Sequence, residues 1–190
     1  MSLDNQFFYT IKPESLKIIW ENFSKKINGK FNFKESIRAN VNGPIYTYKI
    51  ISNLNDYELK INQTVYIIAG GNDQPTAQEY VLSKESNREI HFSIWRKDFF
   101  EKLFGLNKAD TGDQEIDKNF SLKTNNKRLK ELFKTDEKLR NMLTSKKYLF
   151  FIETRKRVLT MKLKRIGIVK SVEDFDNDIE ILKLVLDSIS

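Results

Sequence analysis

Between residues 31 and 95 the sequence alternates apolar and polar residues with a period of two and contains no helical run. Hydrophobic residues share one parity along Tyr57–Ile68, and they do so again at Ile90, Phe92 and Ile94. Alternation of this kind is typical of half-buried strands. Because no helix separates the strands, we expect hairpin-linked antiparallel pairs rather than βαβ units.

An amphipathic helix is expected at each end of this strand-rich chain. The first begins at Pro13 and ends at Asn28-Gly29, with an apolar stripe of Leu16, Ile19, Trp20, Phe23 and Ile27. The last carries Phe175, Ile179, Leu182, Leu186 and Ile189 on one side, with Asp174, Asp176 and Asp178 in its first turns. We therefore predict a single α+β domain over residues 1–190, in which a curved, mainly antiparallel sheet packs on one face against these helices. Residues 1–4 are expected to be a tag or disordered.

Shorter elements are expected in between. The patterns predict a turn at Gly70–Asp73, a helix at Arg96–Phe104 closed by Gly105, a strand at Asn119–Lys123, capped helices at Asn125–Phe133 and Asp136–Leu143, and a hairpin of Tyr148–Glu153 with Arg157–Ile166. In the second hairpin strand Leu159, Met161 and Leu163 face one way, while Thr160, Lys162 and Lys164 face the other.

The charge of the chain is unevenly distributed along its length. The net charge is +7, yet residues 96–170 hold 21 basic and 10 acidic groups, whereas residues 171–190 hold 1 and 6. Either the acidic C-terminal helix neutralises the basic middle, or the middle binds an anionic partner such as nucleic acid or lipid headgroups. Lys outnumbers Arg 25 to 8, which weakens the case for nucleic acid, since bidentate phosphate and guanine contacts favour Arg.

Several classes of chemistry find no support in the residue pattern. The chain has no cysteine, which excludes disulfides and thiolate sites and fits a reducing compartment, so a cytoplasmic location is expected. No run approaches the ~20 apolar residues of a transmembrane helix. The only histidine, His91, cannot build a multi-histidine metal site. The Asp113–Asp117 segment fails the EF-hand spacing, and its acids are expected to bind local backbone groups instead. We predict no catalytic residue, metal or cofactor.

A cluster of basic residues surrounds the predicted 146–165 hairpin. The anionic-partner candidates are Lys146, Lys147, Arg155, Lys156, Arg157, Lys162, Lys164 and Arg165. Tyr148 and Phe150 could supply stacking surfaces for single-stranded nucleic acid, although the same spacing suits core burial. The alternative is an ordinary solvated basic face.

One stretch looks like a signature. Its motifs are Thr111-Gly112-Asp113, Ile116-Asp117, Phe120-Ser121-Leu122 and Leu139-Arg140-x-Met142-Leu143. This order resembles a bacterial domain family of unknown function with a Gly-Asp, Phe-Asp, Leu-Arg-x-x-Leu pattern, with Ile116 in place of the Phe. The resemblance covers about residues 60–190 and implies a bacterial α+β domain without a known catalytic residue. Some members of the family carry this domain behind transmembrane helices, so the chain could equally be the cytoplasmic part of a membrane-associated protein.

From these patterns we expect a non-enzymatic binding or scaffold domain, with a protein partner or a membrane surface favoured. A nucleic-acid-binding protein that uses the 146–165 hairpin is the alternative. An enzyme without a recognisable motif is the third.

Overall fold

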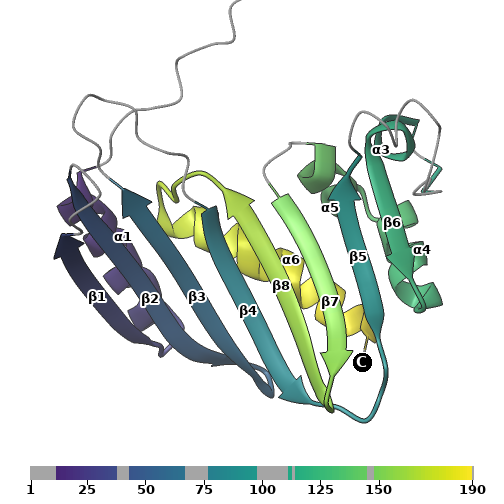
Figure 1. Cartoon of the computed structure of the whole chain (residues 1–190), viewed down its shortest axis with the longest axis horizontal. Helices are drawn as coiled ribbons and strands as arrows, with labels where there is room; N and C mark the ends of the chain where they lie inside the picture. The colour runs from purple at the N-terminus through teal and green to yellow at the C-terminus, as the bar shows by residue number, and fades with distance from the viewer. Residues whose placement is uncertain are drawn as a thin grey trace, which may run out of the picture.

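Eight strands of the chain form one antiparallel sheet in the computed structural model, which describes residues 12–37, 43–66, 77–97, 111–112, 114–144 and 148–189 (Figure 1). The strands are β1 (Lys30–Ile37), β2 (Pro44–Leu54), β3 (Tyr57–Tyr66), β4 (Ala77–Glu85), β5 (His91–Arg96), β6 (Phe120–Thr124), β7 (Tyr148–Arg155) and β8 (Val158–Ile166). The helices are α1 (Pro13–Lys26), α3 (Gln114–Asn119), α4 (Lys127–Thr135), α5 (Glu137–Thr144) and α6 (Val172–Ile189). The predicted α+β fold with an antiparallel sheet is confirmed.

The order of the strands in space is β1-β2-β3-β4-β8-β7-β5-β6. Strands β1 to β4 follow one another as the alternation predicts. The β7–β8 hairpin then inserts between β4 and β5, so that β8 pairs with β4 and β7 pairs with β5. A segment distant in the sequence thus joins the two halves of the chain in the middle of the sheet.

Helices α1, α4, α5 and α6 lie on one face of the sheet (Figure 1). In α1 the side chains of Leu16, Trp20 and Phe23 are buried, as the stripe predicts. The Phe175 ring of α6 stacks on Phe23 with centroids 4.2 Å apart and meets Trp20 edge-on at 5.1 Å. Such ring pairs add about 0.5–1.5 kcal/mol to the burial of their apolar surface.

The other end of the core is built on α4. The Phe133 ring packs 4.8 Å from Phe92 of β5 and 6.2 Å from Phe150 of β7. Both short helices are capped: Asn126, rather than the predicted Asn125, accepts a hydrogen bond from the Leu129 amide, and Asp136 accepts one from the Leu139 amide as predicted. One continuous hydrophobic cluster joins this end to the α1–α6 end.

The predicted end of the first helix at Asn28-Gly29 is confirmed: α1 ends at Lys26, and Asn28 takes the left-handed conformation at φ 51°. Gly29 is needed for close packing, because an added Cβ would lie 2.8 Å from Cγ2 of Ile50. The β7–β8 turn contains only Lys156 and Arg157, with φ of 49° and 61°, so β7 extends beyond its predicted end to Arg155 and β8 begins at Val158 rather than Arg157. These values are those of a tight two-residue hairpin turn.

A further correction concerns residues 114–119, for which no helix was predicted and where the structure has the short helix α3 around the buried Ile116. Six residues are too few for helical periodicity to show in a sequence. Strand β5 also includes Arg96, which was expected to begin a helix. The rest of that predicted helix, the turn at Gly70–Asp73 and residues 1–4 lie outside the described residues.

Candidate binding surface

The face of the sheet opposite the helices carries the candidate surface, which we call the open face. Successive side chains of a strand point to opposite faces, and directly paired residues point to the same face. Buried residues such as Tyr80, Phe150 and Leu163 therefore define the helix-covered face, and their sequence neighbours define the open one. No described helix packs across the open face (Figure 1).

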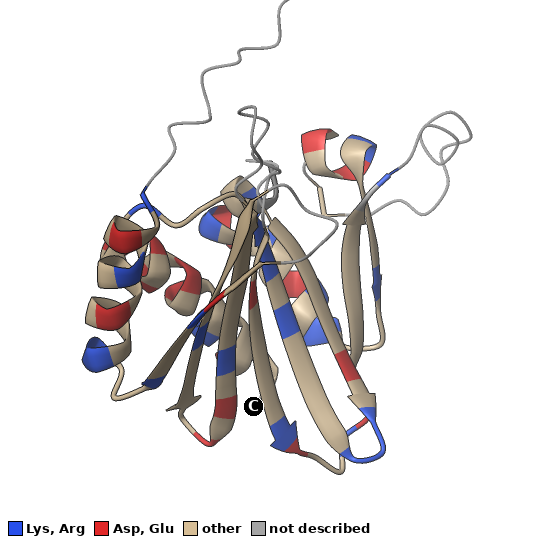
Figure 2. Ribbon diagram, turned by 60° about the vertical axis from the view of Figure 1, so that its left-hand side comes forward, with Lys and Arg blue, Asp and Glu red and all other residues tan. Residues whose placement is uncertain are grey.

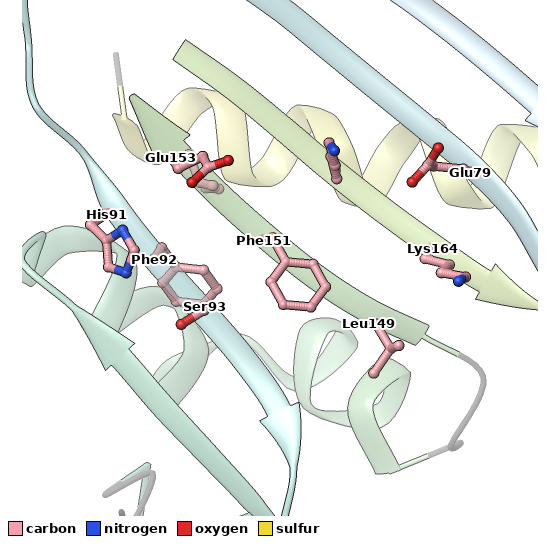
Figure 3. Close-up of a pocket in the computed structure, with 10 residues that line it drawn as sticks. Glu79, His91, Phe92, Ser93, Leu149, Phe151, Glu153 and Lys164 are labelled. Atoms are coloured by element: carbon pink, nitrogen blue, oxygen red, sulfur yellow. The ribbon is translucent and has the colours of Figure 1, made fainter. Parts of the chain in front are cut away.

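A hollow of about 420 Å³ lies on the open face over strands β4, β8, β7 and β5 (Figure 3). Its lining includes both charge signs, a hydroxyl and apolar side chains, from Glu79, His91, Ser93, Leu149, Phe151, Glu153, Lys162 and Lys164. The Phe151 ring stands in the middle of this group (Figure 3). The hollow has the size and mixed lining of a small binding site.

The register of the strands places five of the open-face residues in one line across the sheet, which we call the central row. Lys162 pairs with Val81 on one side and with Phe151 on the other. Ser93 pairs in turn with Phe151 and with Lys123. An exposed aromatic ring therefore has a lysine on each side of it. The two lysine backbones are three strand spacings apart, or about 14 Å.

Phe151 is exposed over 38% of its surface, although it lies in the middle of the sheet. Two further apolar residues of the open face, Val158 and Ile166 at the ends of β8, are exposed over 39% and 44%. Trp95 of β5 is half-buried, and the Lys123 ammonium lies 5.4 Å from its ring centroid. Exposed rings beside cations are typical of interaction surfaces.

Basic residues outnumber acidic ones on the open face, and Figure 2 shows where charged residues lie along the strands. By the strand register its basic residues are Lys30, Lys34, Lys49, Lys60, Lys123, Arg155, Lys162 and Lys164, and its acidic residues are Glu58, Glu79, Glu85 and Glu153. Lys60 pairs with Glu58, and Arg155 pairs with Glu153 at 3.0 Å. The six other lysines form no ion pair with any described residue. An anion approaching this face therefore meets cations that are still available.

Acidic residues of the C-terminal helix α6 form ion pairs on the helix-covered side of the sheet. Asp174 and Asp178 of α6 bind Arg165 of β8, and Asp176 binds Lys26 of α1 at 2.7 Å. The acidic C-terminal helix therefore does neutralise basic residues, which was one of the two alternatives, but these residues lie on the helix-covered side of the sheet. The acids of α6 thus do not compensate the excess of lysines on the open face.

The eight candidate cations of the sequence separate into four groups. Lys162 and Lys164 lie on the open face in the hollow, and Arg155 lies on the same face in its ion pair with Glu153. Lys156 and Arg157 form the exposed turn. Arg165 belongs to the helix-covered face and is only 9% exposed, so a partner cannot reach it. Lys146 and Lys147 lie outside the described residues.

Of the two roles that the sequence left open for Tyr148 and Phe150, the structure supports packing in the core rather than stacking on a partner. Phe150 is fully buried under α4, and the Tyr148 hydroxyl points into the protein, where it donates to Asp178. The exposed ring is the adjacent Phe151. Lys123 was missed as well, because β6 reaches this surface only through the strand order.

A buried polar cluster under β4, β7 and β8 is the other concentration of titratable groups. Asp178 has no exposed surface and accepts hydrogen bonds from the Tyr80 hydroxyl at 2.5 Å, the Tyr148 hydroxyl at 2.7 Å and Nη1 of Arg165 at 3.3 Å. Nη2 of Arg165 donates to Asp174 at 2.8 Å. The cluster therefore joins α6 to three strands.

Burial sets the titration of this cluster. It raises the pKa of the Asp178 carboxyl, and the Arg165 charge with the two tyrosine hydroxyls offsets only part of that rise. For Asp174 burial acts in the same direction, but the hydrogen bonds from Arg165 and from the backbone outweigh it and lower the pKa. Burial also raises the pKa of the Tyr80 hydroxyl, with a further contribution from Asp178. Since Asp178 and Tyr80 are closed to solvent, we assign the cluster to holding α6 on the sheet.

The open face does not assemble a nucleophile with a base. His91 and Ser93 lie two residues apart on β5, and Glu153 is the register partner of His91. No hydrogen bond joins the His91 ring to either residue, and Glu153 is held by Arg155. A general base must lie within hydrogen-bond reach of the group it activates. Among the described residues of the open face, no hydrogen-bonded pair of nucleophile and base is therefore present.

Of the acids near residue 115, Asp117 binds local groups, as the sequence indicated. The Asp117 carboxylate accepts from the Thr111 amide at 2.7 Å, the Thr111 hydroxyl at 2.9 Å and the Gly112 amide at 3.2 Å. Asp113 lies outside the described residues. In the described ranges no group of three or more acidic or histidine side chains could hold a metal ion, and no helix there is long and apolar enough to cross a membrane.

Comparison with known protein families, with curated proteins and with solved structures finds no match to this chain. The function of the open face is therefore inferred from its residues alone.

Proposed function

We propose that this protein is a non-enzymatic binding domain whose open face binds an anionic partner. The observation that carries the proposal is the exposed Phe151 ring in a hollow, with Lys162 and Lys123 on either side of it in the central row and neither lysine in an ion pair with a described residue. Cations that are free of carboxylates attract an anion, and an exposed ring adds apolar contact once the anion is bound.

The location of the charge supports binding on this face. On the helix side, acids of α6 are paired with basic residues of α1, α5 and β8. On the open face, Glu79 and Glu85 are the acids without an ion pair to a described residue, against six such lysines. An anionic partner is therefore attracted mainly to the sheet. A bacterial origin and a cytoplasmic location remain part of the same proposal, the latter on the absence of cysteine.

The test compares two variants with the same change in net charge. Lys123→Glu with Lys162→Glu reverses two cations of the central row, and Lys25→Glu with Lys183→Glu reverses two exposed lysines of α1 and α6. Each protein is loaded on immobilised heparin, used as a polyanionic probe, and eluted with salt. We expect the first variant to elute at distinctly lower salt than the second. Equal elution would show that attraction depends on net charge alone, and would refute the proposal.

A further inference from the structure

Resting on the proposed function, we propose that the anionic partner is single-stranded nucleic acid, which crosses the central row with a base stacked on Phe151 and phosphates on Lys162 and Lys123. Neither the resemblance nor the predicted hairpin site assigns this line of residues. It runs across strands β8, β7, β5 and β6, and only Lys162 of these three contacts was among the sequence candidates.

The aromatic ring is the first part of the argument. Phe151 lies in the hollow between its register partners Ser93 and Lys162 (Figure 3). The residue is 38% exposed, so a planar ligand can reach it. Stacking of a base on an aromatic side chain contributes about 1–3 kcal/mol and does not depend on which base is present. Bases are available for this contact in a single strand and are covered by their neighbours in a duplex.

The position of the cations is the second part. Lys162 and Lys123 flank the ring at a backbone separation of about 14 Å, so a chain whose base rests on Phe151 can bring a phosphate to either side. The neighbouring line of register partners, which contains Lys164, is less suitable for binding a phosphate. Its Glu79 is the register partner of Lys164 and lines the same hollow. The central row contains no acidic residue.

The type of cation does not favour nucleic acid over other anions, but it determines how nucleic acid would be bound. Every basic residue of the open face except Arg155 is a lysine, and Arg155 is held by Glu153. Lysine contacts phosphate as a point charge, whereas bidentate contacts to guanine come from arginine or a rigidly placed lysine. We therefore infer binding with little sequence preference, in which phosphates supply the salt dependence and the ring supplies the stacking.

Other occupants fit the surface less well. A second copy of the chain would bring an equally basic face against this one. An anionic membrane presents no planar group to a ring that sits within a hollow, and an acidic peptide satisfies the lysines but leaves Phe151 without a stacking partner. These three occupants differ from nucleic acid in how much binding depends on Phe151.

The test uses fluorescence anisotropy with labelled oligothymidylate of about 12 nucleotides, which is within the site size of a single binding fold. Phe151→Thr is expected to weaken binding about tenfold without changing its salt dependence. Phe151→Tyr should restore the affinity. Ile166→Thr is the matched control, since Ile166 is as exposed as Phe151 and lies on the same face outside the row.

Charge is tested with a second matched pair. Lys123→Gln with Lys162→Gln and Lys156→Asn with Arg157→Gly each remove two positive charges, the first from the row and the second from the hairpin turn. The row variant should reduce the slope of log affinity against log salt by about 0.7 per lysine. The turn variant should reduce it less.

The outcomes separate the two proposals. Loss of oligothymidylate affinity in both Phe151→Thr and the row variant supports the inference. If Phe151→Thr binds like wild type, there is no stacking and the inference is overturned. Polyglutamate or phosphatidylserine vesicles that bind through the same lysines, in the absence of oligothymidylate binding, would overturn the inference while supporting the proposed function. No binding to any of the three probes would overturn both.

Discussion

Replacement of Asp178 by alanine should be the most destabilising single change in the polar interior. The carboxylate has no exposed surface and receives hydrogen bonds from Tyr80, Tyr148 and Arg165. Without it, the fully buried Tyr80 hydroxyl loses its acceptor, at a cost of about 1–3 kcal/mol. The Arg165 guanidinium loses one of its two carboxylates and keeps Asp174. Removal of one partner of a buried ion pair costs about 3–5 kcal/mol, and we expect Asp178→Ala to fall in that range.

The same geometry ranks related variants. Asp178→Asn keeps the shape and one acceptor oxygen, so it should cost less, about 2 kcal/mol. Tyr148→Phe should cost less than Tyr80→Phe, because Tyr148 is only half-buried and Tyr80 is fully buried. Asp176→Ala is the matched control on the same helix: it breaks an exposed ion pair with Lys26 and should cost less than about 1 kcal/mol.

Equilibrium urea unfolding, followed by circular dichroism, measures these differences as changes in the free energy of unfolding. Asp178→Ala should unfold at much lower urea than Asp176→Ala with a similar slope. At temperatures where Asp178→Asn remains folded, its affinity for anionic probes should equal that of wild type. A destabilisation no larger than that of Asp176→Ala would refute the argument that this cluster holds α6 on the sheet.

Three further changes follow from local geometry, each measured by urea or thermal unfolding. Lys156→Asn with Arg157→Gly should stabilise the protein by about 1 kcal/mol, because both turn residues have positive φ and Asn-Gly favours that conformation; no gain would contradict the turn assignment. Gly29→Ala should destabilise by about 1–3 kcal/mol, since its Cβ would lie 2.8 Å from the buried Ile50 side chain; wild-type stability would show that the contact can relax. The pKa of Asp174 is lowered in the folded protein, so its carboxylate stabilises the fold at pH values above the ordinary pKa of 3.8, and this stabilisation is lost as the pH falls through the lower pKa of the folded state. The difference in the free energy of unfolding between wild type and Asp174→Asn should therefore become smaller in acid, and a difference that does not change with pH would contradict this.

The alternation of single strands was sufficient to predict the sheet and one of its faces. In β8 the apolar residues Leu159, Met161 and Leu163 are buried and Lys162 and Lys164 are exposed, as the period-two pattern indicates. The same rule applied one residue further would have placed Arg165 inside with Leu163. The acids that accept its charge come from α6, a contact that the sequence pattern does not reveal.

Strand β7 shows where alternation stops being informative. Its two parities are both apolar, with Tyr148, Phe150 and Ile152 on one side and Leu149 and Phe151 on the other. Because both sides of β7 carry apolar residues, the sequence does not determine whether Phe150 or Phe151 is covered by a helix. The answer depends on where α4 packs, because Phe133 of that helix covers Phe150.

The central row depends on pairing between distant segments. Lys123 reaches Ser93 through the β5–β6 pairing, and Ser93 reaches Phe151 only because the late β7–β8 hairpin inserts beside β5. Strand order of this kind is set by the burial of the whole sheet against its helices rather than by any local motif. The sequence therefore identified basic residues of the hairpin, but not the surface that they share with β6.

The two tryptophans provide the most direct measurement of binding on the open face. Trp20 is fully buried between α1 and the sheet, whereas Trp95 is half-buried on the open face beside Lys123. Titration with unlabelled oligothymidylate should quench the tryptophan emission of the wild-type protein, and Trp95→Phe should abolish the quenching while the protein stays folded. Binding that leaves the emission unchanged, or quenching that persists in Trp95→Phe, would contradict the account.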